Sequence, residues 1–179
     1  DPIKNPDIWH ELIRKTTEFE IRYALALREA GADIVWCCQH HAAWPPQVFK
    51  EHIAPYDAEL VKRGRLDGWI YAFNQAAHVE IAHEAGLYDK PINFLQFDVE
   101  TPLEFITEFT KEIGVAYICL LHDKVLLAGE EKITEYVKKA LALGVRGFGG
   151  GAIDYWTPPQ NVDAFVKAVK EYGKFPLRM

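Results

Sequence analysis

The stretch ADIVWCC, residues 32–38, decides the fold class. Apart from Asp33 it is apolar throughout, without the alternation of a half-buried strand, so it predicts a strand covered on both faces. Such strands are typical of parallel sheets with helices packed on both sides. The segments on either side of it have helical patterns, so this part of the chain is predicted to run helix, strand, helix.

The segment before this strand, residues 7–31, has the pattern of a long amphipathic helix. Asp7 suits its N-cap and Gly31 its C-terminal stop. Its apolar residues recur near the helical spacing at Ile8, Leu12, Ile13, Phe19, Tyr23 and Leu27. The segment after the strand, residues 45–64, is helical again, and Pro55 is expected to bend or restart that helix.

The same alternation continues to the end of the chain. Further strands are predicted at 68–73, 92–98, 115–121 and 145–151, and further helices at 76–86, 102–114, 130–144 and 159–173. Five strands, each followed by a helix, predict a parallel α/β architecture with right-handed crossovers, in one unit over residues 1–179. A doubly wound sheet and a barrel both fit this pattern. A complete barrel takes about 250 residues, so five units correspond to a barrel without its early strands.

Composition and charge exclude several classes of protein. The formal net charge is -6 and the basic residues are spread out, which does not favour binding to nucleic acid or to an anionic membrane. No apolar run approaches the roughly 20 residues of a membrane span. Three cysteines, two of them adjacent, fit a reducing compartment rather than a disulfide framework. We therefore expect a cytoplasmic protein with a small-molecule or protein partner.

Polar residues cluster directly after the predicted strands, where ligands bind in parallel α/β proteins. Two imidazoles and two carboxylates suit general acid-base chemistry, and we assign that role to His40, Asp98, His122 and Asp123. Ligand contacts are expected from Cys38, Gln39, His41, Asn74, Gln75, Gly149, Gly150 and Gly151. The three consecutive glycines allow a ligand to approach the backbone, but their spacing is not the G-x-G-x-x-G of a dinucleotide site.

A zinc site is the alternative interpretation of the cysteines and histidines at residues 37–41. Cys38 and His40, with Asp98 or His122, would supply enough ligands, whereas Cys37 and Cys38 point to opposite faces of a strand and cannot bind one ion together. The simpler interpretation is that the cysteines pack as small apolar residues. His78 and His83 lie about 140° apart around a helix, so we interpret the sequence HVEIAH as a solvated surface.

Three stretches carry a resemblance to a known family: EIRYALALREAGADIVW (20–36), PPQVFKEHIAPYDAEL (45–60) and GVRGFGGGAIDYWTPPQNVDAFVKAVKEYG (144–173). In order and spacing they resemble the late helices and strands of the uroporphyrinogen decarboxylase superfamily, whose members share a (β/α)8 barrel. The resemblance covers nearly the whole chain and implies the C-terminal half of such a barrel. It also implies one of two activities: decarboxylation of a porphyrinogen without metal or cofactor, or zinc-dependent methyl transfer between a corrinoid and a thiol or small donor.

The sequence departs from both branches of this superfamily. Residues 38–40 stand where the decarboxylases have a sequence like F-D-S, and residues 149–151 match a G-H-G whose histidine is absent. The H-x-C of the methyltransferases is replaced by YAFNQ (71–75), and the glycine-rich turn has no cysteine, so the expected zinc ligands are missing. The carboxylate-binding arginines and catalytic aspartate of the decarboxylases belong to the N-terminal half, which is not in this chain.

Three functions therefore follow as hypotheses. The first is a divergent enzyme, without a cofactor, that decarboxylates a carboxylated small molecule or a tetrapyrrole. The second is a methyltransferase of the same superfamily with a corrinoid protein as partner. The third is a non-catalytic half-barrel that binds a partner. Because open sheet edges favour association, we expect an oligomer or a second chain that completes the barrel. The chain begins without Met, as expected of a fragment.

Overall fold

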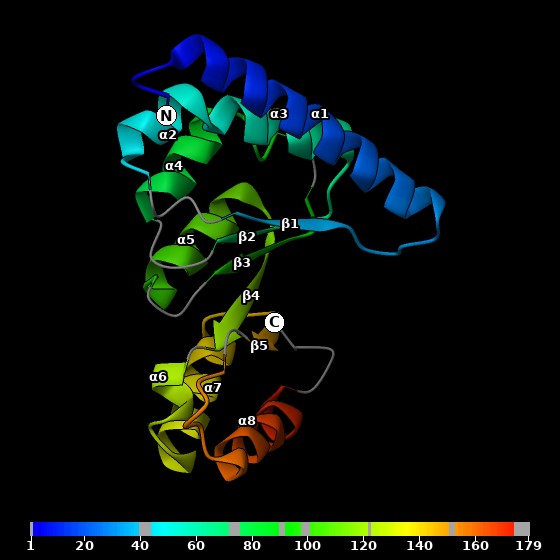
Figure 1. Cartoon of the computed structure of the whole chain (residues 1–179). Helices are drawn as coiled ribbons and strands as arrows, with labels where there is room; N and C mark the ends of the chain where they lie inside the picture. Colours follow the sequence, from blue (N-terminus) through cyan, green and yellow to red (C-terminus); the bar gives the residue numbers. More distant parts are fainter. Residues whose placement is uncertain are drawn as a thin grey trace. The chain divides into compact units, whose positions relative to one another are not determined.

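The fold is seen in a computed structural model that describes residues 2–39, 44–71, 76–89, 92–97, 101–121, 123–150 and 153–173 (Figure 1). Its internal contacts divide the chain into two units, Asp1–Leu95 and Gln96–Met179. None of the helices in the described ranges is long and apolar enough to cross a membrane.

Within its described residues, the first unit contains two parallel strands and four helices. In chain order these are α1 (Pro6–Glu29), β1 (Trp36–Gln39), α2 (Pro46–His52), α3 (Ala54–Gly64), β2 (Gly68–Tyr71) and α4 (Ala76–Glu84). Strand β3 (Phe94–Phe97) begins in this unit. Strands β1 and β2 run parallel, with Cys38 opposite Ile70. Their carboxyl ends therefore lie side by side.

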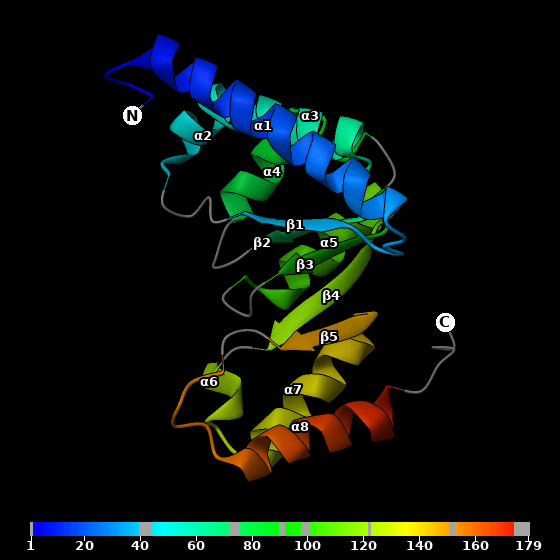
Figure 2. The ribbon, with the colours of Figure 1, turned by 45° about the vertical axis from the view of Figure 1, so that its right-hand side comes forward.

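The second unit repeats the same pattern after β3. It contains α5 (Leu103–Ile113), β4 (Ala116–Leu121), α6 (Asp123–Leu126), α7 (Glu130–Ala142), β5 (Gly147–Gly150) and α8 (Pro159–Tyr172). Strands β4 and β5 are parallel, with Leu120 opposite Gly149. Helices α7 and α8 lie side by side in both views, beyond β5 (Figures 1 and 2). The predicted alternation of five strands and helices, and the α/β class, are confirmed.

The buried core lies between the strands and the helices of each unit. The fully buried large side chains are Phe49, Val61, Trp69, Val79, Leu87, Leu95, Phe97, Ile106, Leu121 and Ile133. Along β4 the burial alternates, with Tyr117, Cys119 and Leu121 buried and the residues between them half-buried. One face of this strand is therefore packed against helices more closely than the other.

The prediction that residues 32–38 are covered on both faces is wrong for this structure. Val35 is 5% exposed, whereas Ile34 and Trp36 are 59% and 51% exposed. Cys38, on the same side of the strand as Trp36, is exposed too. Helices α2, α3 and α4 lie on one side of β1 in both views (Figures 1 and 2), so the apolar pattern of residues 32–38 exceeds the burial found for them.

Helix α1 also differs from its prediction at its start and in its packing. It begins at Pro6 with Asn5 as N-cap, not at Asp7, because proline suits the first turn of a helix. Its buried residues are Thr17, Ile21 and Ala24, which pack toward α3. The expected restart at Pro55 is confirmed, since α2 ends at His52 and Pro55 lies in the first turn of α3.

Asp67 connects the segments that lead into the strands of the first unit. Its carboxylate Oδ2 accepts hydrogen bonds from the Val35 backbone N–H at 2.7 Å and from Arg28 Nη2 at 2.6 Å. Its Oδ1 accepts a weaker one from the side chain of Asn93 at 3.3 Å. A single side chain thus ties the end of α1 and the starts of β1 and β3 to the residue preceding β2.

Candidate functional site

Most of the residues predicted for the site lie outside the described part of the chain. These are His40, His41, Asn74, Gln75, Asp98, His122 and Gly151. For Gln39 and Asp123 the structure places the backbone and not the side chain, and Gly150 lies in the backbone of β5. The roles of all these residues, and the zinc alternative built on His40, remain predictions. The described residues nevertheless place the strand ends from which the site would be built.

Cys38 lies at the carboxyl end of β1 and is the exposed member of the cysteine pair. The expectation that both cysteines are packed is therefore wrong for Cys38. Although the residue as a whole is exposed, partial burial raises the pKa of its thiol above the ordinary value. The neutral thiol is thus favoured, whereas nucleophilic attack and metal binding need the thiolate. Cys38 is better suited to contact a ligand than to react with it.

His78 of α4 is hydrogen-bonded to Trp44, which lies two residues before α2. It is 6% exposed, so its interpretation as part of a solvated surface is wrong. Its Nε2 lies 3.0 Å from the backbone carbonyl oxygen of Trp44. Because a carbonyl only accepts, Nε2 carries the proton. The ring also packs on buried Phe49, with 4.9 Å between centroids. Sequence reasoning found the HVEIAH motif but not this role, which depends on Trp44, 34 residues away.

Gly149 provides space for the side chain of Gln96. A Cβ at position 149 would overlap the amide nitrogen Nε2 of Gln96 and touch Leu120 at 3.4 Å. The polar amide of β3 therefore lies over the backbone of β5, near the carboxyl ends of the strands. The approach of a ligand to this glycine stays a prediction, and in the structure the Gln96 side chain lies against it. Gln96 was not predicted as a site residue. The one feature of the sequence that could have identified it is its position as the polar residue within the apolar strand FLQF.

Asp123 begins α6 directly after β4, as its predicted position at a strand end requires. The far end of this short helix is fixed, because Asn161 of α8 donates a hydrogen bond to the Leu126 carbonyl at 2.6 Å. Leu126 itself belongs to a buried cluster with Leu121 and Ile133. The backbone at Asp123 is therefore held on a packed support at the end of β4.

The loop after β5 presents two exposed aromatic side chains. Tyr155 and Trp156 are 89% and 78% exposed, with their rings 5.2 Å apart in an edge-to-face arrangement. The Asp154 carboxylate accepts a hydrogen bond from the Trp156 backbone N–H at 2.7 Å, which closes a local turn. The sequence analysis did not single out these aromatics. They provide flat apolar surface in the loop that leaves the candidate site.

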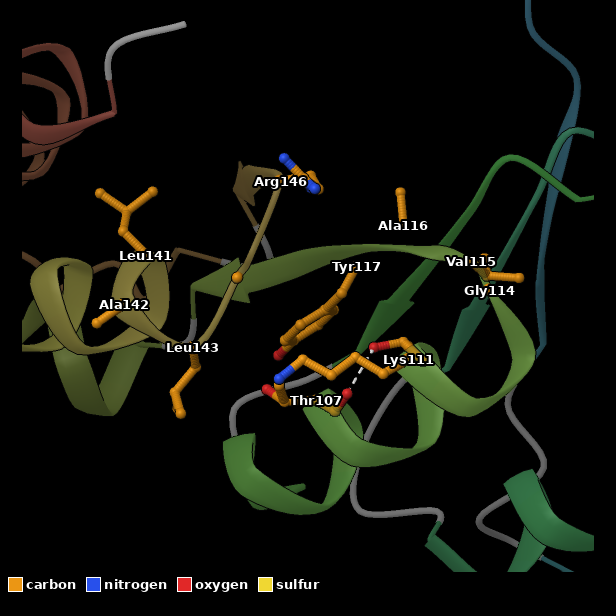
Figure 3. Close-up of a pocket in the computed structure, with 12 residues that line it drawn as sticks. Thr107, Lys111, Gly114, Val115, Ala116, Tyr117, Leu141, Ala142, Leu143 and Arg146 are labelled. Atoms are coloured by element: carbon orange, nitrogen blue, oxygen red, sulfur yellow. Dashed lines mark hydrogen bonds between the residues drawn. The ribbon is translucent and has the colours of Figure 1, made fainter. Parts of the chain in front are cut away.

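A cavity of about 580 Å³ lies elsewhere in the second unit, at the amino ends of β4 and β5 (Figure 3). Tyr117, Lys111 and Thr107 gather on one side of it, and Leu143 and Arg146 lie toward α7 and β5. Ligands of parallel α/β proteins bind at the opposite, carboxyl ends of the strands. We therefore do not assign this cavity to the candidate site.

No group of three or more histidine, cysteine, aspartate or glutamate side chains that could hold a metal ion occurs within the described ranges. Because His40, Asp98 and His122 are outside those ranges, this finding leaves the zinc alternative untested.

Comparison with known proteins gives the family. The sequence profile of the uroporphyrinogen decarboxylase (URO-D) family matches residues 1–172. The chain belongs to the URO-D family. It is similar to a uroporphyrinogen decarboxylase of Rickettsia bellii (strain RML369-C), with 25% identity over 180 residues. That match covers 94% of this chain and 51% of the relative.

The structure also resembles that of a methyltransferase from Methanosarcina mazei, with a TM-score of 0.74 and 22% sequence identity. This likeness covers 96% of the present chain and 52% of the methyltransferase. It supports the fold, a part of a TIM barrel, and not the activity. The chain thus spans about half the length of both relatives. The URO-D resemblance noted in the sequence is confirmed.

Proposed function

We propose that this URO-D family member is an enzyme that removes a carboxylate from a small molecule or a tetrapyrrole. The observation that carries the proposal is the family match over residues 1–172. Its Rickettsia relative, a uroporphyrinogen decarboxylase, matches over nearly the whole chain. The reaction breaks a C–C bond, releases CO2, and leaves an electron pair on carbon that an acid must protonate.

The residues after the strands can supply this chemistry. His40 and His122 are the proposed proton donors, because imidazole exchanges protons near neutral pH. Asp98 and Asp123 are the proposed carboxylates that orient a donor or stabilise a cationic intermediate. Gln39, Asn74 and Gln75, with His41 and Cys38, are assigned to substrate binding. The glycines at residues 149–151 are assigned to close approach of the ligand to the backbone, beside the Gln96 amide that lies against Gly149.

The side chains described at the site suit a flat, carboxylated substrate. Gln96 offers an amide donor close to the strand ends, and the Tyr155–Trp156 pair offers apolar ring surface. Aromatic rings of this kind stack on extended π-systems. A cofactor is not required by the proposed reaction, and zinc at Cys38 and His40 is the alternative arrangement of the same residues.

Methyl transfer is the second candidate reaction. The methyltransferase neighbour, at a TM-score of 0.74, supports it at the level of the fold. A corrinoid protein would then be the partner. We rank it lower because residues 71–75 and 149–151 contain neither a cysteine nor a histidine, the residue types that bind zinc best.

A non-catalytic half-barrel that pairs with another chain is the third candidate, because the chain spans about half of each relative. We further propose a cytoplasmic location, on the basis of three cysteines of which none forms a disulfide bond in the described residues.

Parallel assays separate these candidates. The purified chain is incubated with uroporphyrinogen under anaerobic conditions, and separately with methylcobalamin and a thiol. Decarboxylation predicts products lighter by one or more CO2 in mass spectrometry, while methylcobalamin stays intact. Loss of the methyl group from cobalamin, with unchanged porphyrinogen, would replace the proposal by methyl transfer. Absence of both reactions would favour the half-barrel that binds a partner.

A further inference from the structure

The cavity at the amino ends of β4 and β5 has the lining of a second binding site. It lies between the C-terminal ends of α5 and α7, and its volume of about 580 Å³ is within the roughly 300–1,000 Å³ of small-molecule sites. The buried ring of Tyr117 lines it and packs edge-to-face on Phe97, with 5.7 Å between centroids. An ion pair between Glu104 and Lys139 at 2.8 Å also joins α5 to α7. The cavity is therefore built on packed elements of the second unit.

The charged side chains that line the cavity are both basic. They are Lys111, in the last turn of α5, and Arg146, directly before β5, and none of the described residues that line the cavity is acidic. Lys139 of α7 is balanced by its ion pair with Glu104. Among the described residues, by contrast, none forms an ion pair with Lys111. The ammonium group of Lys111 is therefore available to an anionic ligand.

The hydrogen-bond donors of the cavity gather on the side of α5. In Figure 3 the Lys111 side chain runs along this helix with its amino group toward Tyr117 and Thr107, while Arg146 lies on the other side of the cavity. The Thr107 hydroxyl already donates to the Leu103 carbonyl at 2.7 Å. Lys111, with three N–H groups, and the Tyr117 hydroxyl are therefore the donors that suit a carboxylate on this side.

The two helix ends at the cavity limit the charge of the ligand. The C-termini of α5 and α7 each place about half a negative charge there, against the two positive charges of the basic side chains. The sum is about one positive charge, which suits a monoanion. The last carbonyls of both helices are also capped, since the Val115 N–H donates to the Thr110 carbonyl at 3.0 Å and the Val145 N–H to the Ala140 carbonyl at 3.1 Å. They therefore compete little with a ligand for the cations.

Much of the remaining lining is apolar. Val115 and the end of α7, Leu141–Leu143, contribute aliphatic side chains, and the planar guanidinium of Arg146 can stack on an aromatic ring. We propose that this cavity binds a small aromatic monocarboxylate, whose carboxylate contacts Lys111 and Tyr117 and whose ring packs between the end of α7 and Arg146. The inference does not depend on the proposed reaction, because the candidate site is assigned to the opposite ends of the strands.

Titration of the isotope-labelled chain with naphthalene-2-carboxylate, followed in amide NMR spectra, tests the site. The signals of residues 110–117 and 141–146 should shift and saturate, with a Kd of about 0.1–1 mM for a probe of this size. Naphthalene-2-methanol has the same rings without the charge, so its affinity should be lower by about 10-fold or more. Naphthalene-2,6-dicarboxylate carries a second negative charge and should bind no more tightly than the monocarboxylate.

Two variants test the assigned contacts. Lys111→Gln removes the ammonium group and should weaken binding of the monocarboxylate by about 10-fold or more. Lys111 is exposed, so this variant should keep the amide spectrum of a folded chain. Arg146→Gln removes the stacking guanidinium and should weaken binding by about 3-fold. Lys62→Gln is the matched control, because Lys62 is also an exposed lysine in the last turn of a helix, α3, and it should bind the probe as the wild type does.

Four results would overturn the proposal. One is the absence of saturable shifts at about 5 mM probe, well above the predicted Kd. Another is a set of shifts outside both residue ranges, which would place the binding elsewhere. The third is equal binding by Lys111→Gln and the wild type, or by the neutral alcohol and the carboxylate, which would show that the cation does not select the ligand. The fourth is tighter binding of the dicarboxylate, which would assign the cavity to a dianion instead.

Discussion

Replacing Asp67 by alanine is predicted to destabilise the first unit by about 3 kcal/mol. Two contacts dominate the loss. The Val35 backbone N–H donates to the carboxylate at 2.7 Å, and a hydrogen bond to a charged group contributes about 1.5–3 kcal/mol. The ion pair with Arg28 is partly buried, with side chains 27% and 16% exposed, and adds up to about 1 kcal/mol. The longer bond from Asn93 adds little.

Urea unfolding followed by tryptophan fluorescence measures this loss. Four of the five tryptophans lie in the first unit, and one of them, Trp69, is fully buried two residues after Asp67. Asp67→Asn keeps an acceptor for the Val35 N–H and removes the charge, so it should lose only about 1 kcal/mol. Glu80→Ala, an exposed change on α4, should stay within about 0.5 kcal/mol of the wild type. An Asp67→Ala variant as stable as Glu80→Ala would show that the Asp67 carboxylate does not stabilise the first unit.

Three further predictions concern single buried or crowded side chains. His78→Ala removes the bond to Trp44 and the packing on Phe49, so the free energy of unfolding should fall by about 2–3 kcal/mol in the same urea assay; a change below about 0.5 kcal/mol would contradict the anchoring role. Burial, and then the nearby Asp57, raise the pKa of Glu20, which makes the ionised form destabilising in the folded state above its unfolded pKa. Glu20→Gln should therefore stabilise the protein at pH 7 by a few tenths of a kcal/mol to about 1 kcal/mol, and this gain should vanish as the pH falls below about 4. An equal gain at pH 7 and below pH 4 would show that the charge of Glu20 is not what destabilises the folded state. In a double-mutant cycle of Gly149→Ala with Gln96→Ala, the two changes should couple by about 0.5–1 kcal/mol, because the added methyl group takes the space of the Gln96 amide; strictly additive effects would show that it does not.

Periodicity predicted the order and type of the elements well, because each helix and strand has its own local pattern. The helix restart at Pro55 was predictable for the same reason, since proline fixes its own backbone angle and lacks an N–H. The short helix α6 was missed, because four residues are too few to show a helical period.

Periodicity did not predict which apolar residues are buried. In α1 the spacing singled out Leu12 and Phe19, yet the helix buries the smaller Thr17 and Ala24 against α3. A hydrophobic pattern shows that a face of a helix is apolar, but it does not show which other segment packs on that face. Helix α1 has two such faces, because Leu12 and Phe19 are exposed while Thr17 and Ala24 are buried.

The strand ends on which the candidate site is proposed were predictable, and the long-range contacts beside them were not. Strand ends follow from the alternation, so Cys38 and Asp123 fall where the sequence placed them. The contact of Gln96 with Gly149, and that of His78 with Trp44, join residues 53 and 34 positions apart. Such pairs are created by the packing of distant segments, which a local pattern does not contain.

We propose that the residues after the strands form the active site of a URO-D family decarboxylase. The most direct test is the rate of CO2 release from uroporphyrinogen by the wild type, His40→Ala and Asp98→Ala, with Glu80→Ala as control. The wild type and the control should release CO2, and the two site variants should lose about 100-fold or more of the rate. Rates for His40→Ala and Asp98→Ala equal to that of the wild type would contradict it.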